Sequence, residues 1–348
     1  ERDAITLKAE KDKVAKLETF LAEYVRGQAS RVVDYDSVSD AQVLLLLALD
    51  RAVSPRLTQG GFTLGDCRGL APLYISGFLK TLNDAGLFLE DPSKAKPGTY
   101  YWKGDDVWQV SAQVVYLLMP NTPYAEGEEV IRRLSERTYT DAEGIFNLWL
   151  DYSVADVMCY LQTQCELYNH ELTEQAWDEI KSTLRCALET YSVSQLWSVA
   201  WKVVRDAASL ANREYYTRQK AAATVAGKVR RYLERVERES LELKSWSRPE
   251  QQPVGTLGML LGEMFGVDEH TSGIAAMSRI RMLTGEGNSS MEAELGAPIR
   301  ELMTNALAMD NAACVMLRFA ELIRAGHDVS FAVEGVVGSL SARMTRPG

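Results

Sequence analysis

Apolar residues recur at three- and four-residue steps through most of the chain, which is the spacing of helices that bury one face. Proline is absent from Tyr124 to Arg248, and because proline breaks helix interiors this stretch predicts consecutive helices. Thr140 and Thr173 stand where the N-caps of two of these helices are expected. Ser192 or Ser194 is expected to cap a third. The middle of the chain therefore predicts a helical bundle.

Two further segments carry an apolar stripe with a spacing close to a heptad. The stripe of the N-terminal segment, 1–33, is Leu7, Val14, Leu17, Leu21 and Tyr24. A long helix predicted from about Thr217 to Ser245 carries Val225, Val229, Tyr232, Val236 and Leu243. Neither stripe sustains four heptads, so ordinary helix packing is the expected account of both, and pairing with a partner helix stays open.

The segment 38–111 predicts helices followed by strands. Ser39 precedes an apolar helix, Gln42–Val53; a short helix is expected within Phe62–Leu70, and a third helix over Tyr74–Ala85 ends where Gly86 fits the C′ position. Aromatic and β-branched residues then flank the turn at Gly104, which predicts a hairpin. Its two strands are Thr99–Lys103 and Val107–Ser111.

Three helices followed by a hairpin, with Leu79, Leu82, Gly86 and Leu87 around the end of the third helix, resembles a winged helix-turn-helix domain. The resemblance is confined to residues 38–111. It implies that the third helix enters the DNA major groove and that the hairpin lies on the backbone or in the minor groove. The residues that it implies for these contacts are Tyr74, Ser76, Lys80, Lys94, Lys96 and Lys103.

Acidic residues at the same module favour a different role. A DNA-reading surface normally surrounds its base contacts with cations, whereas here Glu90, Asp91, Asp105 and Asp106 stand beside the lysines. The module is therefore equally compatible with a winged helix that contacts proteins or packs on its own helical domain.

The expected fold is mainly α, a winged-helix-like domain with a small β-hairpin joined to an α-helical bundle and a C-terminal helical domain. The expected parts are an N-terminal amphipathic helix (1–33), the winged-helix-like domain (34–113), the bundle (114–245), a linker (246–256) and the C-terminal domain (257–348). The linker is predicted from two prolines and a glycine between Trp246 and Gly255. Short helices are expected beyond it, at Met259–Phe265, Ile274–Met282, Ile299–Met309, Ala313–Ile323 and Phe331–Leu340.

Charge is unevenly distributed along the 348 residues. Apolar residues make up 46% and charged residues 25%, the composition of a globular chain, and the net charge of −10 argues against indiscriminate binding of nucleic acid. Residues 191–249 nevertheless carry 12 basic and 6 acidic side chains. This basic block predicts a phosphate track, with two tyrosines for base stacking. Its candidate residues are Arg213, Tyr215, Tyr216, Arg218, Lys220, Lys228, Arg230, Arg231 and Arg235.

The sequence shows no catalytic or metal-binding motif, so we expect no enzyme activity, no cofactor and no metal. Cys159 and Cys165 would point apart on one helix and do not form a zinc clip with His170. Five cysteines without framework spacing suit a reducing cytoplasm, which is the expected location. The longest apolar run, Val43–Leu49, is too short to cross a membrane, and no secretion signal is visible at the N-terminus.

Three functions follow as hypotheses. The first is a non-enzymatic winged-helix protein that binds nucleic acid, most readily DNA. The second is a structural or adaptor subunit of a multiprotein assembly, in which the winged helix is a protein-interaction surface and the amphipathic helices bind a partner or a second copy. The third is an enzyme with a site built from scattered acids, which the missing motifs disfavour.

Overall fold

The computed structural model describes residues 2–28, 31–121, 127–285, 312–324, 331–333 and 335–336. The chain divides into two compact units, Glu1–Ile280 and Arg281–Gly348. In the second unit, helix α13 (Ala312–Arg324) buries Val315 together with Val336. The expected helix at Ile299–Met309 lies outside the described residues, as does half of the one expected at Phe331–Leu340.

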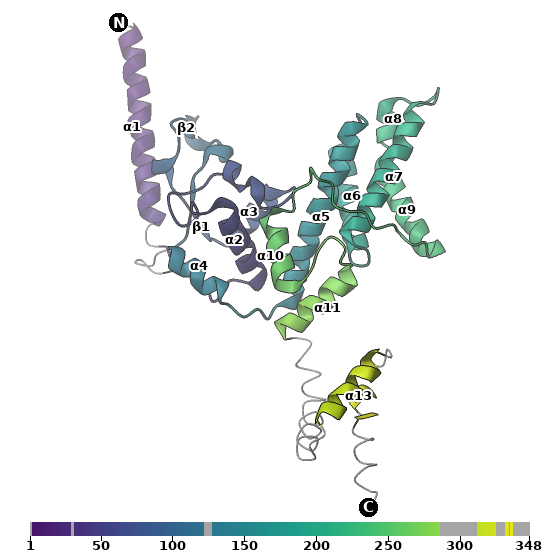
Figure 1. The fold of residues 1–348 in the computed structure, drawn as a ribbon. Helices are drawn as coiled ribbons and strands as arrows, with labels where there is room; N and C mark the ends of the chain where they lie inside the picture. The colour runs from purple at the N-terminus through teal and green to yellow at the C-terminus, as the bar shows by residue number, and fades with distance from the viewer. Residues whose placement is uncertain are drawn as a thin grey trace, which may run out of the picture. The chain divides into compact units, whose positions relative to one another are not determined.

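The first unit is mainly helical, as predicted, with two small antiparallel pairs of strands (Figure 1). Its helices are α1 (Arg2–Gln28), α2 (Asp40–Val53), α3 (Ile75–Asp84), α4 (Gly127–Ser135), α5 (Ala142–Leu167), α6 (Glu174–Leu188), α7 (Val193–Ala211), α8 (Arg218–Ala222), α9 (Val225–Glu239), α10 (Gly255–Phe265) and α11 (Gly273–Thr284). Three short 3-10 helices are η1 (Leu64–Gly69), η2 (Pro92–Lys94) and η3 (Ser111–Gln113). None of the helices in the described ranges is both long enough and apolar enough to cross a bilayer.

Local capping signals place most helix starts. The Ser39 and Ser192 side chains form capping boxes at the starts of α2 and α7, and the Thr173 hydroxyl accepts a hydrogen bond from the first turn of α6. The prediction for α5 was wrong by one residue, because Asp141 and not Thr140 caps it. The backbone N–H of Thr140 instead donates to Asp40 at 2.6 Å, a contact across 100 residues.

The long helix predicted from Thr217 to Ser245 is two helices, α8 and α9. The Thr224 hydroxyl donates to the Ala221 carbonyl at 2.7 Å, where the chain leaves α8, and such back-bonding competes with helix continuation. At the other end α9 stops at Glu239, and Ser240 takes a left-handed conformation with φ of 50°. The predicted apolar stripe of α9 does face the core.

The strands follow the predicted hairpin closely. Strands β2 (Tyr100–Lys103) and β3 (Asp106–Gln109) pair antiparallel, with Tyr100 opposite Gln109. Two strands that the sequence did not indicate, β1 (Phe88–Glu90) and β4 (Tyr116–Leu118), flank the hairpin in the chain and pair with each other. Residues 38–111 thus keep the predicted order of three helical segments before the hairpin, but the second segment is the short η1, and β1 and η2 stand between α3 and the hairpin.

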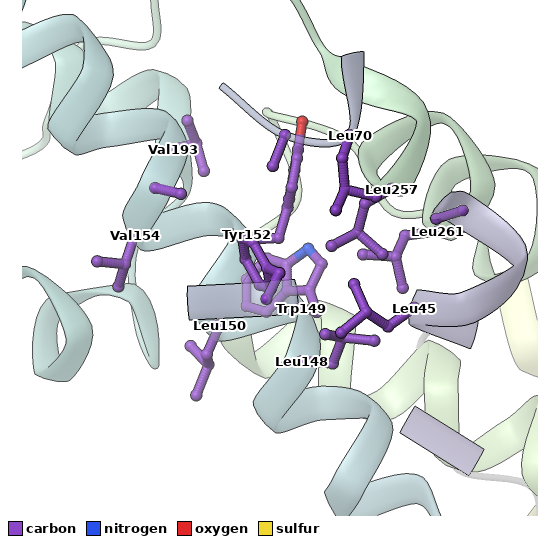
Figure 2. Packing of buried hydrophobic residues seen from close by; sticks show 14 of the residues in the cluster. Leu45, Leu70, Leu148, Trp149, Leu150, Tyr152, Val154, Val193, Leu257 and Leu261 are labelled. Carbon is purple, nitrogen blue, oxygen red and sulfur yellow. The ribbon is translucent and has the colours of Figure 1, made fainter. Parts of the chain in front are cut away.

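One hydrophobic cluster runs through the first unit from α2 to α11. Figure 2 shows Leu45 of α2, Leu257 and Leu261 of α10 and Trp149 of α5 gathered in it. The segment predicted as a linker is packed against this core, since Gln252 is buried and its side chain donates to the Asp156 carbonyl at 2.8 Å. The β1–β4 pair, through Phe88 and Leu118, and the helical bundle therefore share one core.

Candidate functional site

The third helix of the module, α3, offers little cationic surface. Tyr74, at its N-cap, is half-buried against α6, where the Lys181 ammonium lies 4.5 Å from the centre of its ring. Burial, and then Asp178, raise the pKa of Tyr74. Lys80 is exposed but pairs with Asp84 at 2.5 Å. The exposed Ser76 lines a small pocket of about 200 Å³ between α3 and the β1–β4 pair.

The lysines near the hairpin are also largely engaged. Lys94 pairs with Asp91 at 3.6 Å, and the Lys103 ammonium lies 4.0 Å from the centre of the Trp108 ring. Lys96 is exposed and makes no ion pair within the described ranges. Since ion-paired cations must give up a partner to bind phosphate, this surface is less cationic than the sequence suggests.

The basic block divides into two groups. Five of its residues are exposed without an ion pair to any residue the structure describes, in the loop after α7 and in α8: Arg213, Tyr215, Tyr216, Arg218 and Lys220. In α9, Arg230 pairs with Glu179 at 3.2 Å and Arg235 pairs with Glu239 at 2.8 Å. Lys228 is half-buried and Arg231 is exposed.

The hairpin lysines and the basic block do not form one surface. In Figure 1, β2 stands beside α1 on one side of the first unit, and α8 stands on the other side, with α3, α5 and α6 between them. The hairpin and the basic block therefore do not form one continuous surface for nucleic acid, which the sequence had left possible.

A groove with a volume of about 770 Å³ lies between α1 and the hairpin. Its walls are largely aromatic, and we name it the aromatic groove. Phe20 of α1 meets Trp102 of β2 edge-on, with ring centres 6.1 Å apart. The lining residues are Phe20, Leu21, Tyr24, Glu90, Tyr100, Trp102, Asp105, Asp106, Val107, Trp108 and Gln109.

The aromatic groove combines exposed apolar surface with unsatisfied polar atoms. Trp108 is 47% exposed, Phe20 42% and Tyr24 40%, although large aromatic side chains normally gain by burial. The Trp102 indole N–H and the Tyr100 hydroxyl are buried and meet no hydrogen-bond partner of normal geometry in the described structure. Aromatic surface with a few unsatisfied polar groups is typical of a ligand site.

Comparison of the chain with protein-family models, curated proteins and solved structures gave no match.

No group of three or more histidine, cysteine, aspartate or glutamate side chains is arranged to hold a metal ion, within the residues that the structure describes. His170 and Cys165 are both buried. Burial lowers the pKa of His170 and raises that of Cys165 to about 12, so both stay neutral near pH 7.

Sequence reasoning missed the aromatic groove because its two walls are far apart in the chain. The signals were Phe20 and Tyr24, one turn apart on α1, and Tyr100 with Trp102, which alternate along β2 and so share one face. Neither pair on its own indicates that the two faces meet.

Proposed function

We propose that this chain is a non-enzymatic adaptor that binds an extended segment of a partner protein in the aromatic groove. The observation that carries the proposal is the cluster of half-exposed aromatic side chains from α1 and the hairpin. Such residues are the usual anchors of protein interfaces, because they bury large area with few rotatable bonds. The acidic rim at Asp105 and Asp106 suits a basic segment by charge complementarity.

A random peptide library selected on the purified chain tests this function. We expect selected peptides to lose about tenfold or more in affinity when Trp108→Ala or Phe20→Ala removes an anchor, as measured by calorimetry. Tyr101→Ala is the control, since Tyr101 of β2 is 41% exposed and lies opposite Trp108 in the hairpin but does not line the groove. Equal losses in all three variants, or no selected peptide at all, would contradict the proposal.

Nucleic-acid binding is a second proposal, limited to the loop after α7 and the start of α8. It is supported by Arg213, Arg218 and Lys220, which are exposed without an ion pair in the described structure, and by Tyr215, which is 85% exposed. Exposed aromatic rings among cations suit single strands, whose bases stack on them.

A salt titration tests this second proposal. We expect weak binding of single-stranded DNA, with affinity that decreases as salt concentration rises. The slope of log affinity against log salt should become shallower by about 0.7 for each of Arg213 and Arg218 replaced by alanine. Arg132→Ala, which removes an exposed arginine paired with Glu129 and Glu136, is the control. A slope that is the same in all variants counts against a site at this loop.

A further inference from the structure

Glu90 is an uncompensated carboxylate in the aromatic groove. It ends strand β1 and is half-buried, and its side chain accepts a hydrogen bond from the Tyr24 hydroxyl at 3.4 Å. It forms no ion pair with a lysine or arginine anywhere in the described part of the chain. Carboxylates removed from water are normally paired, so the groove holds a charge that a ligand could neutralise.

Three tyrosines surround this carboxylate. Tyr24 lies on α1, Tyr100 on β2, and Tyr116 faces Glu90 across the β1–β4 pair. The pKa values of all three are raised, first by burial and next by the charge of Glu90. Their hydroxyls therefore remain neutral near pH 7.

The cations near the groove do not form an ion pair with Glu90 in the described structure. Lys103 lies over Trp108, which shows that one ring of the groove already holds a cation on its face. Arg31 has only a minor influence on Tyr24, smaller than that of burial or of Glu90. Asp105 and Asp106 are exposed at the rim, so an incoming positive charge meets acidic groups before it reaches Glu90.

We propose that the aromatic groove selects an arginine side chain of the partner segment, which stacks on its rings and pairs with Glu90. This rests on the adaptor function proposed above. A guanidinium matches both features, because its plane stacks on aromatic faces and its fork of N–H donors pairs with a carboxylate.

The test uses blocked arginine amide and its neutral isostere, blocked citrulline amide, as probes of the full chain. The indole N–H signals of Trp102 and Trp108 are followed by NMR, assigned with Trp102→Phe and Trp108→Phe. We expect arginine to shift these signals with a dissociation constant about tenfold or more below that of citrulline, because a hydrogen bond to a charged partner is stronger than one between neutral groups.

Glu90→Gln keeps the shape of the side chain and removes its charge, so the preference for arginine over citrulline should disappear in this variant. Asp105→Asn is the matched control, and it should keep most of the preference because Asp105 is at the exposed rim. Equal binding of both probes, no shift of either indole signal, or a preference that survives in Glu90→Gln would overturn the inference.

The library selection separates this inference from the adaptor function. Peptides that bind the groove and are enriched in arginine support both. Peptides that depend on Trp108 and Phe20 but carry no more arginine than the unselected library would overturn the arginine inference and leave the adaptor function standing. The absence of any groove-dependent peptide would overturn the two together.

Discussion

Arg248→Met is expected to lower the free energy of unfolding by about 3–5 kcal/mol at neutral pH, because it leaves a buried carboxylate without its partner. Arg248 holds Asp156 with both terminal nitrogens, at 3.2 and 2.7 Å, and Asp156 is fully buried. Arg248 also lies 3.4 Å from a Glu269 oxygen and packs over the Trp197 ring. Urea unfolding of wild type and variant measures the difference.

The deficit of Arg248→Met should depend on pH. Burial raises the pKa of Asp156, while Arg248 and Gln252 oppose that rise. Without Arg248 the pKa rises further above the ordinary value of about 3.9, which the unfolded chain keeps. A carboxyl of this kind stabilises the fold below the unfolded pKa and loses that contribution as pH rises through the folded pKa. The deficit should therefore be larger at pH 7 than at pH 5.

Two further variants separate the effect of the buried ion pair between Arg248 and Asp156 from the effect of lost packing. Arg185→Met breaks an ion pair to Asp151 in which both side chains are more than a third exposed, and it should cost less than about 1 kcal/mol. Adding Asp156→Asn to Arg248→Met removes the stranded charge and should recover part of the stability. A deficit of the same size at both pH values would show that lost packing, and not the stranded charge, dominates.

Features set by neighbouring residues were predictable from the sequence. The caps at Ser39, Thr173 and Ser192 depend on residues within one turn, and the hairpin depends on the residues on either side of Gly104. Each prediction used only the local competition for backbone hydrogen bonds. Such competition is the same whatever the rest of the chain does.

Features set by distant residues were not predictable. Trp246–Gly255 has the composition of a linker, yet Arg248 and Gln252 hold it to Asp156, more than 90 residues earlier. The basic block is cationic when summed along the chain, but Arg230 is paired with Glu179 of another helix. A sequence sum counts a charge and cannot show its partner in space.

The candidate site also depends on contacts between residues that are distant in the chain, so the sequence alone did not predict it. The resemblance to a winged helix predicts nucleic-acid contacts at α3 and at the hairpin lysines, and it predicts no site between α1 and the hairpin. The hydrogen bond between Tyr24 and Glu90 spans 66 residues and joins α1 to β1, and the edge-on contact between Phe20 and Trp102 joins α1 to the hairpin. Without these contacts, the aromatic residues of the hairpin are indistinguishable from ordinary strand formers.

Trp149→Ala is expected to lower the free energy of unfolding by about 3–5 kcal/mol, the usual cost of truncating a fully packed tryptophan. Trp149 of α5 is 2% exposed and stacks on Phe146 with ring centres 5.5 Å apart. Figure 2 shows it beside Leu45 of α2 and Leu257 of α10. Its loss opens a cavity where three helices meet. Calorimetry and urea unfolding measure the effect.

The position of Trp149 makes this variant a test of whether the module and the bundle unfold together. Because α2, α5 and α10 share one core, we expect the first unit to keep a single transition that moves to lower temperature. Trp108→Ala is the matched control: its ring is 47% exposed, so stability should change by less than about 0.5 kcal/mol. A separate early transition in Trp149→Ala would mean that residues 38–111 unfold independently of the helical bundle.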